Sequence, residues 1–448
     1  MKGLGWLLLA LPVMAEEVPV SKKLRQDENW SAWCQSNSPQ YGYKCFEPWQ
    51  GSLLSLGGEI RWRYEYTSAP AWGDEPQDQH GVFMQRYVAF ADWHVAPALR
   101  LFGQFNSALA SGRAGGPSAV DENRLSIQQA FVQWSPAVNT QLVLGRQELN
   151  LGSGRLIDVR EGPNVRRRFD VARVRLDLRQ WQLDILAARP WLIHPGSFDD
   201  RLDHQQALWG IYVVNPELSL GLPGNKVDLY YLGYRNRQAV YAQGEDDELR
   251  HTVGARFWGE QGAWIWNWEL IYQFGHFGQG NIRAWSIASD TRRLLKGQLK
   301  SALGLSANIA SGDNDPDDAD LGTFNALFPR GNYFSELALL GPRNFYNLQP
   351  YFTVNPFPWL ELTGAVDFYW RLSADDGIYS PGGKLLRDGL ETDSRYVATE
   401  LSINAALNLS STTAFTIIYG RSFPGPVIRD TGKHEQTDFV ELTFKVIF

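Results

Sequence analysis

The chain has 448 residues and a formal net charge of -7 at pH 7, so it lacks the basic surplus typical of nucleic-acid-binding proteins. Neither the number nor the spacing of its two cysteines suggests a zinc site. After residue 15, no window approaches the roughly 18 apolar residues that a membrane-spanning helix needs. Aromatic residues make up 13% of the chain, which is high for a soluble protein.

Residues 1–15 have the pattern of a signal peptide. Lys2 supplies the positive charge, Gly3 to Leu11 is a short apolar run, and Val13-Met14-Ala15 offers small or apolar residues for cleavage before Glu16. The apolar run is too short to span a membrane. We therefore expect an exported protein.

Residues 16–50 are polar and irregular, with scattered aromatic residues and both cysteines, Cys34 and Cys45. We expect an N-terminal periplasmic segment here, either a tail or a small plug. Export places the chain in an oxidising compartment, which favours a disulfide between the two cysteines. The alternative is a pair of unlinked thiols.

A strict two-residue alternation begins at residue 53 and returns at the end of the chain. A strand puts successive side chains on opposite faces, so each such segment has one apolar and one polar face. In the first strand, Glu59, Arg61 and Arg63 share the polar face. In the last, the apolar face carries Val440, Leu442, Phe444, Val446 and Phe448. This pattern predicts strands between lipid and a water-filled interior.

The same alternation recurs about 18 times between residues 51 and 448. We expect strands at 53–66, 82–95, 99–109, 127–135, 141–149, 169–179, 181–189, 206–215, 226–235, 249–259, 263–275, 282–291, 297–310, 344–355, 359–372, 395–408, 412–422 and 436–448. Tight turns alternate with long gaps, as in barrels with short periplasmic turns and long extracellular loops. The sequence therefore predicts an all-β fold, a transmembrane antiparallel β-barrel forming one domain over 51–448.

Several segments resemble known outer-membrane proteins. The last strand, closing on Phe448, resembles the terminal signature of bacterial outer-membrane barrels, which implies assembly by the barrel-assembly machinery. Three further segments are similar to the alginate export family: Gly145–Leu149 with Gly152–Leu156 and Arg160–Arg166; Ser311–Asp313 with Leu321–Asn325 and Leu327–Tyr333; and Ile378-Tyr379 with Pro381–Gly383. The resemblance implies a monomeric barrel in the outer membrane of a Gram-negative bacterium. It also implies an arginine-lined, anion-selective constriction that passes a polyuronate outward.

Arginine outnumbers lysine 32 to 10, and its planar fork binds carboxylates in bidentate fashion. A polyuronate carries one carboxylate per sugar, so its pore needs repeated fixed positive charge. We expect the anion to contact Arg61, Arg63, Arg86, Arg146, Arg155, Arg160, Arg166, Arg173, Arg175 and Arg371, with Arg167 and Arg168 on the same loop as Arg160. The alternative is that these arginines only pair with interior carboxylates such as Glu59, Glu65, Asp92, Asp177, Asp367, Glu400 and Glu441.

The acidic run from Asp313 to Asp320 is not an EF-hand, because Asp318 stands where glycine is required and Phe324 where the bidentate Glu belongs. A solvated loop, or a lid opposing the arginines, is expected instead, with adventitious Ca²⁺ as an alternative. The seven histidines show no paired-ligand spacing, and no G-x-S-x-G elbow occurs. We expect neither an enzyme nor a cofactor or metal.

These patterns favour an outer-membrane pore that conducts an alginate-like polyuronate by facilitated diffusion. The expected partners are outer-membrane lipid, the anion and periplasmic export proteins, and no nucleic acid. Alternatives are an uptake porin for uronate oligomers or small organic anions, a plugged structural or adhesive barrel, and a barrel-shaped hydrolase. The sequence leaves the direction of transport and the occluding segment open.

Overall fold

The computed structural model describes residues 22–28, 30, 34, 39–216 and 224–448. The predicted signal peptide at 1–15 lies outside the described residues. Among those described, no helix is long and apolar enough to cross a membrane.

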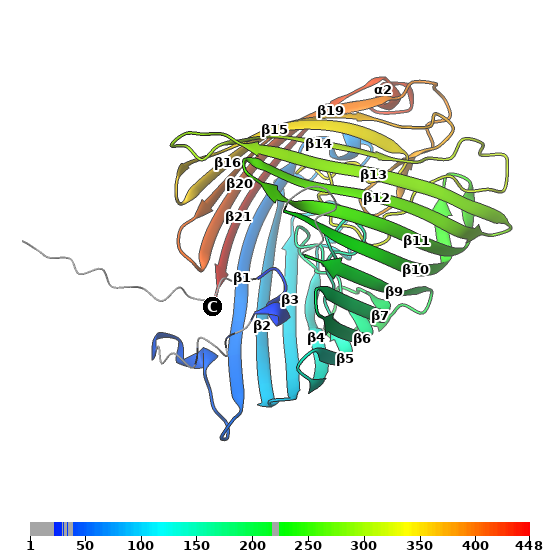
Figure 1. The fold of residues 1–448 in the computed structure, drawn as a ribbon. Coiled ribbons are helices and arrows are strands. Elements are labelled where there is room, and N and C mark those ends of the chain that lie inside the picture. Colours follow the sequence, from blue (N-terminus) through cyan, green and yellow to red (C-terminus); the bar gives the residue numbers. More distant parts are fainter. Residues whose placement is uncertain (1–21, 29, 31–33, 35–38, 217–223) are drawn as a thin grey trace, which may run out of the picture.

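Eighteen long antiparallel strands form a closed barrel (Figure 1). They are β1 (Leu53–Thr67), β2 (Val82–Ala96), β3 (Leu99–Ser111), β4 (Asn123–Ala137), β5 (Thr140–Gln147), β6 (Phe169–Leu178), β7 (Trp181–Leu192), β9 (Gln206–Asn215), β10 (Asn225–Tyr241), β11 (Gly244–Gln261), β12 (Trp264–Phe277), β13 (Gly280–Leu294), β14 (Ala302–Ala310), β15 (Phe345–Phe357), β16 (Leu360–Trp370), β19 (Tyr396–Asn408), β20 (Thr413–Pro424) and β21 (Thr437–Ile447). Each pairs with the next along the chain.

The barrel closes where β21 pairs with β1, in a register that runs from Glu59 opposite Ile447 to Thr67 opposite Phe439. Closure leaves no strand edge facing lipid, which is what a β-structure in a bilayer requires. The short elements are β8 (Arg201–Leu202), β17 (Ile378–Tyr379), β18 (Leu385–Arg387), η1 (Arg25–Asp27), η2 (Pro39–Lys44), η3 (Pro70–Gly73) and α2 (Pro426–Asp430).

The predicted fold is confirmed: every one of the expected strands has a counterpart. The largest extension is at β10, which ends at Tyr241 instead of residue 235, and the largest shortening is at β14, which begins at Ala302 instead of residue 297. There the N–H of Leu295 donates to the carbonyl of Ser301 (2.8 Å), which closes a turn over the intervening residues. The strand expected at 141–149 ends at Gln147, because the chain then leaves the wall for the interior.

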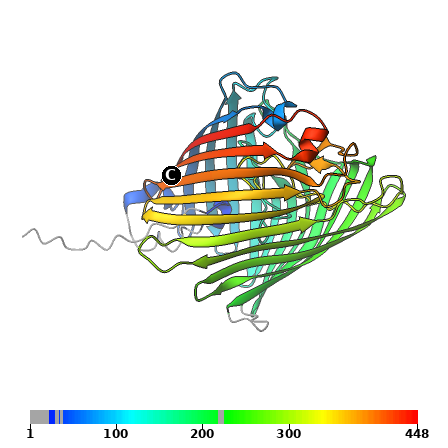
Figure 2. The ribbon, with the colours of Figure 1, turned by 90° about the horizontal axis from the view of Figure 1, so that it is seen from above.

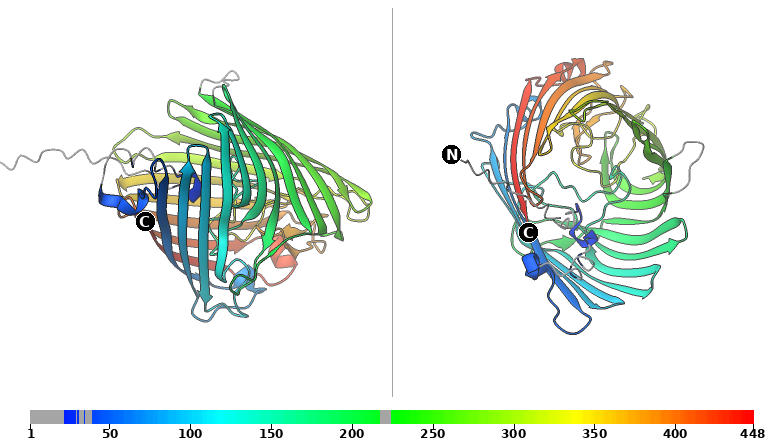
Figure 3. Two further views of the ribbon diagram at one scale, coloured as in Figure 1. Left: turned by 90° about the horizontal axis from the view of Figure 1, so that it is seen from below. Right: turned by 60° about the vertical axis from the view of Figure 1, so that its left-hand side comes forward.

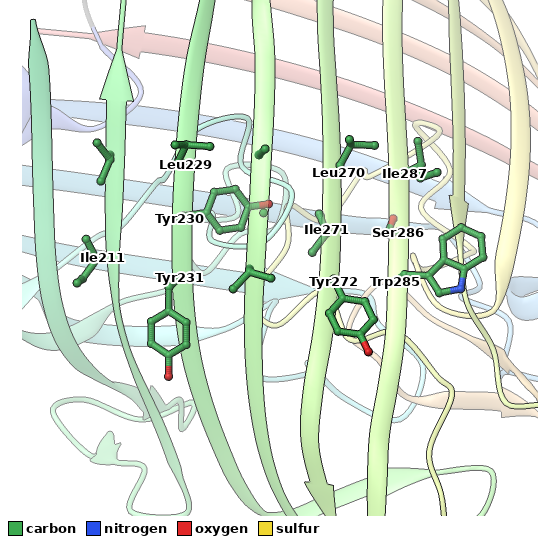
Figure 4. Close-up of a pocket in the computed structure, with 14 residues that line it drawn as sticks. Ile211, Leu229, Tyr230, Tyr231, Leu270, Ile271, Tyr272, Trp285, Ser286 and Ile287 are labelled. Carbon is green, nitrogen blue, oxygen red and sulfur yellow. The ribbon is translucent and has the colours of Figure 1, made fainter.

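The two-residue alternation separates a lipid face from a lumen face. On β12, Leu270 and Tyr272 are each 48% exposed, whereas Ile271 between them is 4% exposed. Figure 4 shows the same alternation on neighbouring strands, around a shallow apolar hollow of about 810 Å³ on the outer surface. An apolar band that alternates with buried side chains is typical of the lipid-facing surface of a membrane barrel.

The two rims of the barrel differ in their connections (Figure 2). At one rim, where the chain ends, short turns join β2 to β3, β6 to β7 and β11 to β12. At the opposite rim lie the long loops, including 148–168, 311–344 and 371–395. We call these the short-turn rim and the long-loop rim. By the general rule for such barrels, the short-turn rim faces the periplasm.

Two of the long loops fold into the barrel instead of extending outward (Figure 3). Loop 148–168 and loop 311–344 pair with each other through a bridge between Ile157 and Phe328. Phe328 packs there with Leu156 and with Phe169 at the start of β6, as part of one large apolar cluster. The long-loop half of the lumen therefore has an apolar core of its own.

Replacement of Leu270 by Arg tests the lipid face. Leu270 lies midway along β12, so the substitution should lower the free energy of unfolding by about 2–4 kcal/mol, the usual cost of Arg near the bilayer midplane. Urea titration of the protein in lipid vesicles measures this. Leu270→Ala is the control and should cost less; equal losses for the two variants would contradict a lipid-facing position.

Candidate functional site

The inward position of loop 148–168 is fixed by an arginine on the barrel wall. The Arg61 guanidinium of β1 is buried and donates to three backbone carbonyls of this loop, those of Glu161 (2.9 Å), Gly162 (3.1 Å) and Pro163 (2.9 Å). A residue about 100 positions earlier in the chain thus clamps the loop's turn. The carbonyls accept from both terminal nitrogens of Arg61, whereas its Nε has no partner among the described residues.

A chain of alternating charges runs from the wall into the loop. Arg86 on β2 binds the carboxylates of Glu59 (2.6 Å) and Glu161 (2.6 Å). Arg166 lies 3.2 Å from both Glu161 and Glu148. Burial alone would raise the pKa of Glu161, but the guanidinium groups of Arg86 and Arg166 hold it well below its usual range. These arginines are matched by carboxylates, as buried charges must be.

The remaining wall arginines of the predicted set also have partners. Arg63 pairs with Glu65 (2.9 Å) and Glu441 (3.1 Å). Arg173 and Arg175 share Asp184, but the Arg175 side chain remains 41% exposed. Of the three, Arg175 keeps the most surface for a ligand.

Two predicted residues lie away from the constriction loop. Arg371 donates to the carbonyls of Gly389 and Ser394 (2.7 Å each) and to that of Thr392, so it staples the loop before β19. Arg146 pairs with Asp170 (3.2 Å) and lies over the ring of Trp191, its guanidinium carbon 3.5 Å from the ring centroid.

Arg146 does not face the lumen. It has the same parity on β5 as Leu144, which is exposed on the outer surface, and its partner Asp170 has the same parity on β6 as outward-facing Ala172. The structure thus places this residue on the outside of the barrel, and we leave it out of the proposed anion path.

A surplus of positive charge occurs on the two inward loops. The guanidinium groups of Arg160, Arg167 and Arg330 form no ion pair among the described residues, and Arg155 only approaches Glu269 at 3.8 Å. The nearest other carboxylate, Asp158, is bound by Lys23. Burial lowers the pKa of Arg160, Arg167 and Arg330 from their usual value, as expected where positive groups are crowded without partners.

Arg330 was missed as a candidate in the sequence. It lies outside the strand pattern, and only its place in the Leu327–Tyr333 segment marked it. The backbone N–H of Arg330 donates to the carbonyl of Gly154 (3.2 Å), which brings Arg330 beside Arg155. The pairing of loops 148–168 and 311–344 is what assembles this cluster.

The N-terminal segment also lies in the lumen, near the short-turn rim (Figure 3). Arg25 of η1 is buried and binds Glu59 on β1 (2.7 Å). Two cavities flank the segment, one of about 460 Å³ that includes Arg100 and Arg175, and one of about 370 Å³ that includes Lys445. Lys22 contributes to both. A disulfide joins Cys34 to Cys45 just before β1.

The acidic run takes the form of an exposed loop. Its aspartates mostly accept hydrogen bonds from their own backbone, as in Asp317 N–H to Asp315 (3.2 Å), and Asp320 binds Asn281. It makes no contact with the arginine cluster among the described residues. Among all the residues that the structure describes, no group of three or more His, Cys, Asp or Glu side chains is placed to hold a metal ion.

Asp313 at the base of this loop provides a pH test. Burial, together with the nearby carboxylate of Asp376, raises its pKa to about 6. The folded loop then holds the proton more tightly than the unfolded chain, so its stability is greatest below about pH 4 and falls as the pH rises to about 6. Proteolysis of loop 311–344 should be faster at pH 7.5 than at pH 5. Asp313→Asn should remove this difference; a pH effect that persists in the variant would assign it to other groups.

The sequence and the fold have known relatives. Residues 52–440 match the Alginate export family. No curated protein matches the chain. Among solved structures, the BenF-like porin from Pseudomonas fluorescens is similar over 88% of this chain and 99% of its own, with 9% identity and a TM-score of 0.59.

Two Pseudomonas aeruginosa structures show the same likeness. OpdR has 12% identity and a TM-score of 0.56, over 89% of this chain and 96% of its own. OpdK, solved with vanillate, has 11% identity and a TM-score of 0.58, over 88% of this chain and 98% of its own. At such low identity these porins show the shared fold, that of outer-membrane β-barrels. With the family match over most of its length, the chain belongs to the Alginate export family of Gram-negative outer-membrane proteins.

Proposed function

We propose that this barrel conducts an anionic polysaccharide, an alginate-like polyuronate, across the outer membrane by facilitated diffusion. The observation that carries the proposal is the surplus of positive charge on the two inward loops, where Arg155, Arg160, Arg167 and Arg330 face two carboxylates, Asp158 and Glu269. The family match supports a uronate polymer as the cargo.

The matched and unmatched arginines have different parts in this proposal. Arg61 and Arg86 hold the constriction loop: backbone carbonyls accept from Arg61, and the carboxylates of Glu59 and Glu161 balance the charge of Arg86. Arg160 and Arg167 retain attraction for a passing carboxylate. Conduction requires binding that is favourable at each point and still weak enough for release, and half-buried guanidinium groups without an ion-pair partner meet that requirement.

Uptake of small organic anions is the second candidate. Two observations favour it: the inward loops fill much of the long-loop half of the lumen, and the fold is similar to that of OpdK, which was solved with vanillate. The cavities of about 460 and 370 Å³ would hold a small anion or a short sugar segment. Both candidates need the same positive constriction and differ in the length of the cargo.

We propose that the last strand, β21, together with Phe448, which follows it, directs assembly by the barrel-assembly machinery, and that a single barrel suffices for conduction. Closure of β21 on β1 supports the second point, because the wall needs no second chain.

Planar-bilayer recordings test the charge argument. Wild-type protein should be anion-selective, and Arg160→Ala with Arg167→Ala should reduce the chloride-to-potassium permeability ratio at least about twofold. A unit charge about 7 Å from an ion contributes roughly 0.6 kcal/mol even at the dielectric constant of water.

Arg235→Ala is the matched control, since Arg235 pairs with Asp247 on the exposed outer surface and should leave selectivity unchanged. Heat-modifiable migration on a gel checks that each variant forms a barrel. Cation selectivity of the wild type, or an unchanged ratio in the double variant, would reject the proposed constriction. Block of the current by a long polyuronate but not by a monomeric uronate would favour the polymer over the small anion.

A further inference from the structure

Part of the chain occupies the lumen as a ligand would. We call the described residues of 22–30 the N-terminal plug. Arg25 binds Glu59 on β1, and the side-chain amide of Gln26 donates to the carbonyl of Glu148 (3.0 Å). The Gln129 amide on β4 donates to the side-chain oxygen of Gln26 (2.8 Å). The plug is thus held by specific polar contacts to the wall and to the constriction loop.

Two lumen arginines donate to backbone oxygens of the plug. Nη2 of Arg100 donates to the carbonyl of Gln26 (2.7 Å), and Nη2 of Arg166 donates to the carbonyl of Lys23 (2.6 Å). These oxygens are neutral acceptors in positions where a carboxylate oxygen would bind more strongly, since hydrogen bonds between ionised partners are roughly twice as strong.

On the same wall, β3 carries two buried amides that are not fully bonded, and the oxygen of one, Gln104, accepts from Gln129, which also contacts the plug. Nε2 of Gln104 and both side-chain polar atoms of Asn106 have no hydrogen-bond partner among the described residues, although both residues are 1% exposed. Unpartnered buried amides are costly to the protein alone and are suited to the hydroxyl groups of a sugar.

A stack of buried aromatic rings lies beneath Arg100 on the same wall, and one of them, Phe131, lines the cavity of about 460 Å³. Phe90, Phe102 and Phe131 stack across β2, β3 and β4 with centroid separations of 5.7 and 5.2 Å, and Arg100 lies over two of the rings. Aromatic rings with a few convergent polar groups are the usual composition of a small-molecule site. Guanidinium, amide and ring together match the carboxylate, hydroxyls and C–H face of a uronic acid.

We propose that the footprint of the N-terminal plug on β2–β4 is a uronate-binding site, in which Arg100 binds a sugar carboxylate, and that plug and uronate compete for it. This rests on the proposed function and adds the site at which the anion first binds. The unpaired arginines of loops 148–168 and 311–344 then receive the anion from this site.

The disulfide sets how far the plug moves when it is displaced. Trp30 precedes Cys34 by four residues, and Cys34 is bonded to Cys45, which lies close to the start of β1. Four residues span at most about 14 Å. The displaced plug therefore stays near the short-turn rim at a high local concentration, as a tethered competitor does.

Block of single-channel current by a uronate hexamer tests the proposal. Arg25→Ala with Gln26→Ala weakens the plug without shortening the chain, and Glu59 keeps Arg86 as its partner. In this double variant the hexamer should block at a concentration about tenfold lower than in wild type, because the competitor is weakened. A neutral hexasaccharide of equal length should not show this gain.

The role of Arg100 is tested in the plug-weakened background by Arg100→Lys. Lysine keeps a cation beside Asp92 but lacks the fork that also reaches the ligand. The hexamer should then block at a concentration about tenfold higher than in the double variant, which is the weight of one charge-assisted hydrogen bond. Arg235→Ala, on the outer surface, is the matched control and should change neither value.

The outcomes separate this proposal from the proposed function. If the double variant conducts more current but its affinity for the hexamer is unchanged, the plug is a steric obstacle and the shared site is rejected. If the neutral hexasaccharide gains equally, the site does not recognise the acid group. If the wild type is anion-selective and is blocked by the hexamer while Arg100→Lys has no effect, the proposed pore is retained and the proposed binding site at Arg100 is rejected. Cation selectivity in the wild type would reject the pore proposal itself.

Discussion

Closure of the hydrogen-bonded wall is the constraint on which the rest of the structure depends. Lipid offers no partner to a backbone N–H or carbonyl, so the strands pair all the way round, with β21 returning to β1. Closure with a two-residue period puts half of the side chains into lipid and half into an enclosed interior. The interior half carries the charges, and once the inward loops cover them these charges need partners. The network of Glu59, Arg86, Glu161 and Arg166 is the consequence.

That network explains why most interior arginines are unsuited to act on a ligand directly. Breaking a buried ion pair by removing one partner typically costs 3–5 kcal/mol, because the other charge remains uncompensated. A pair such as Arg86 with Glu59 is therefore part of the architecture. Arg61, which donates to backbone carbonyls of the constriction loop, is likewise part of the architecture. Positive charge is available where pairing is incomplete, as at Arg160 and Arg167, and those residues lie on loops supported by an apolar core instead of on the wall.

The strands could be predicted because alternation is a local signal, readable in ten residues. The parity rule also placed Arg61, Arg63 and Arg173 on the lumen face correctly. Their partners could not be predicted, because they depend on contacts between distant segments: Arg61 meets the carbonyls of a loop about 100 residues later. Arg146 was placed wrongly because it was chosen by motif, whereas its parity on β5 puts it outside. The irregular N-terminal segment has no period, so its docking in the lumen left no trace in the sequence beyond its aromatic residues and cysteines.

A pore for a polyanion must remain stable when it is empty, and the plug provides a way to do so. Arg100 is paired with Asp92 and Arg166 with Glu148 and Glu161, but Nη2 of each arginine also donates to the plug. Without the plug, that part of each guanidinium would face only water. If carboxylates of the protein filled every donor, no cargo could displace them. Peptide carbonyls are intermediate acceptors: they satisfy the donors but bind less strongly than an ionised oxygen. A neutral tethered segment therefore suits the resting state of a site for acidic sugars, because the favourable exchange of a carbonyl for a carboxylate offsets the cost of displacing the plug.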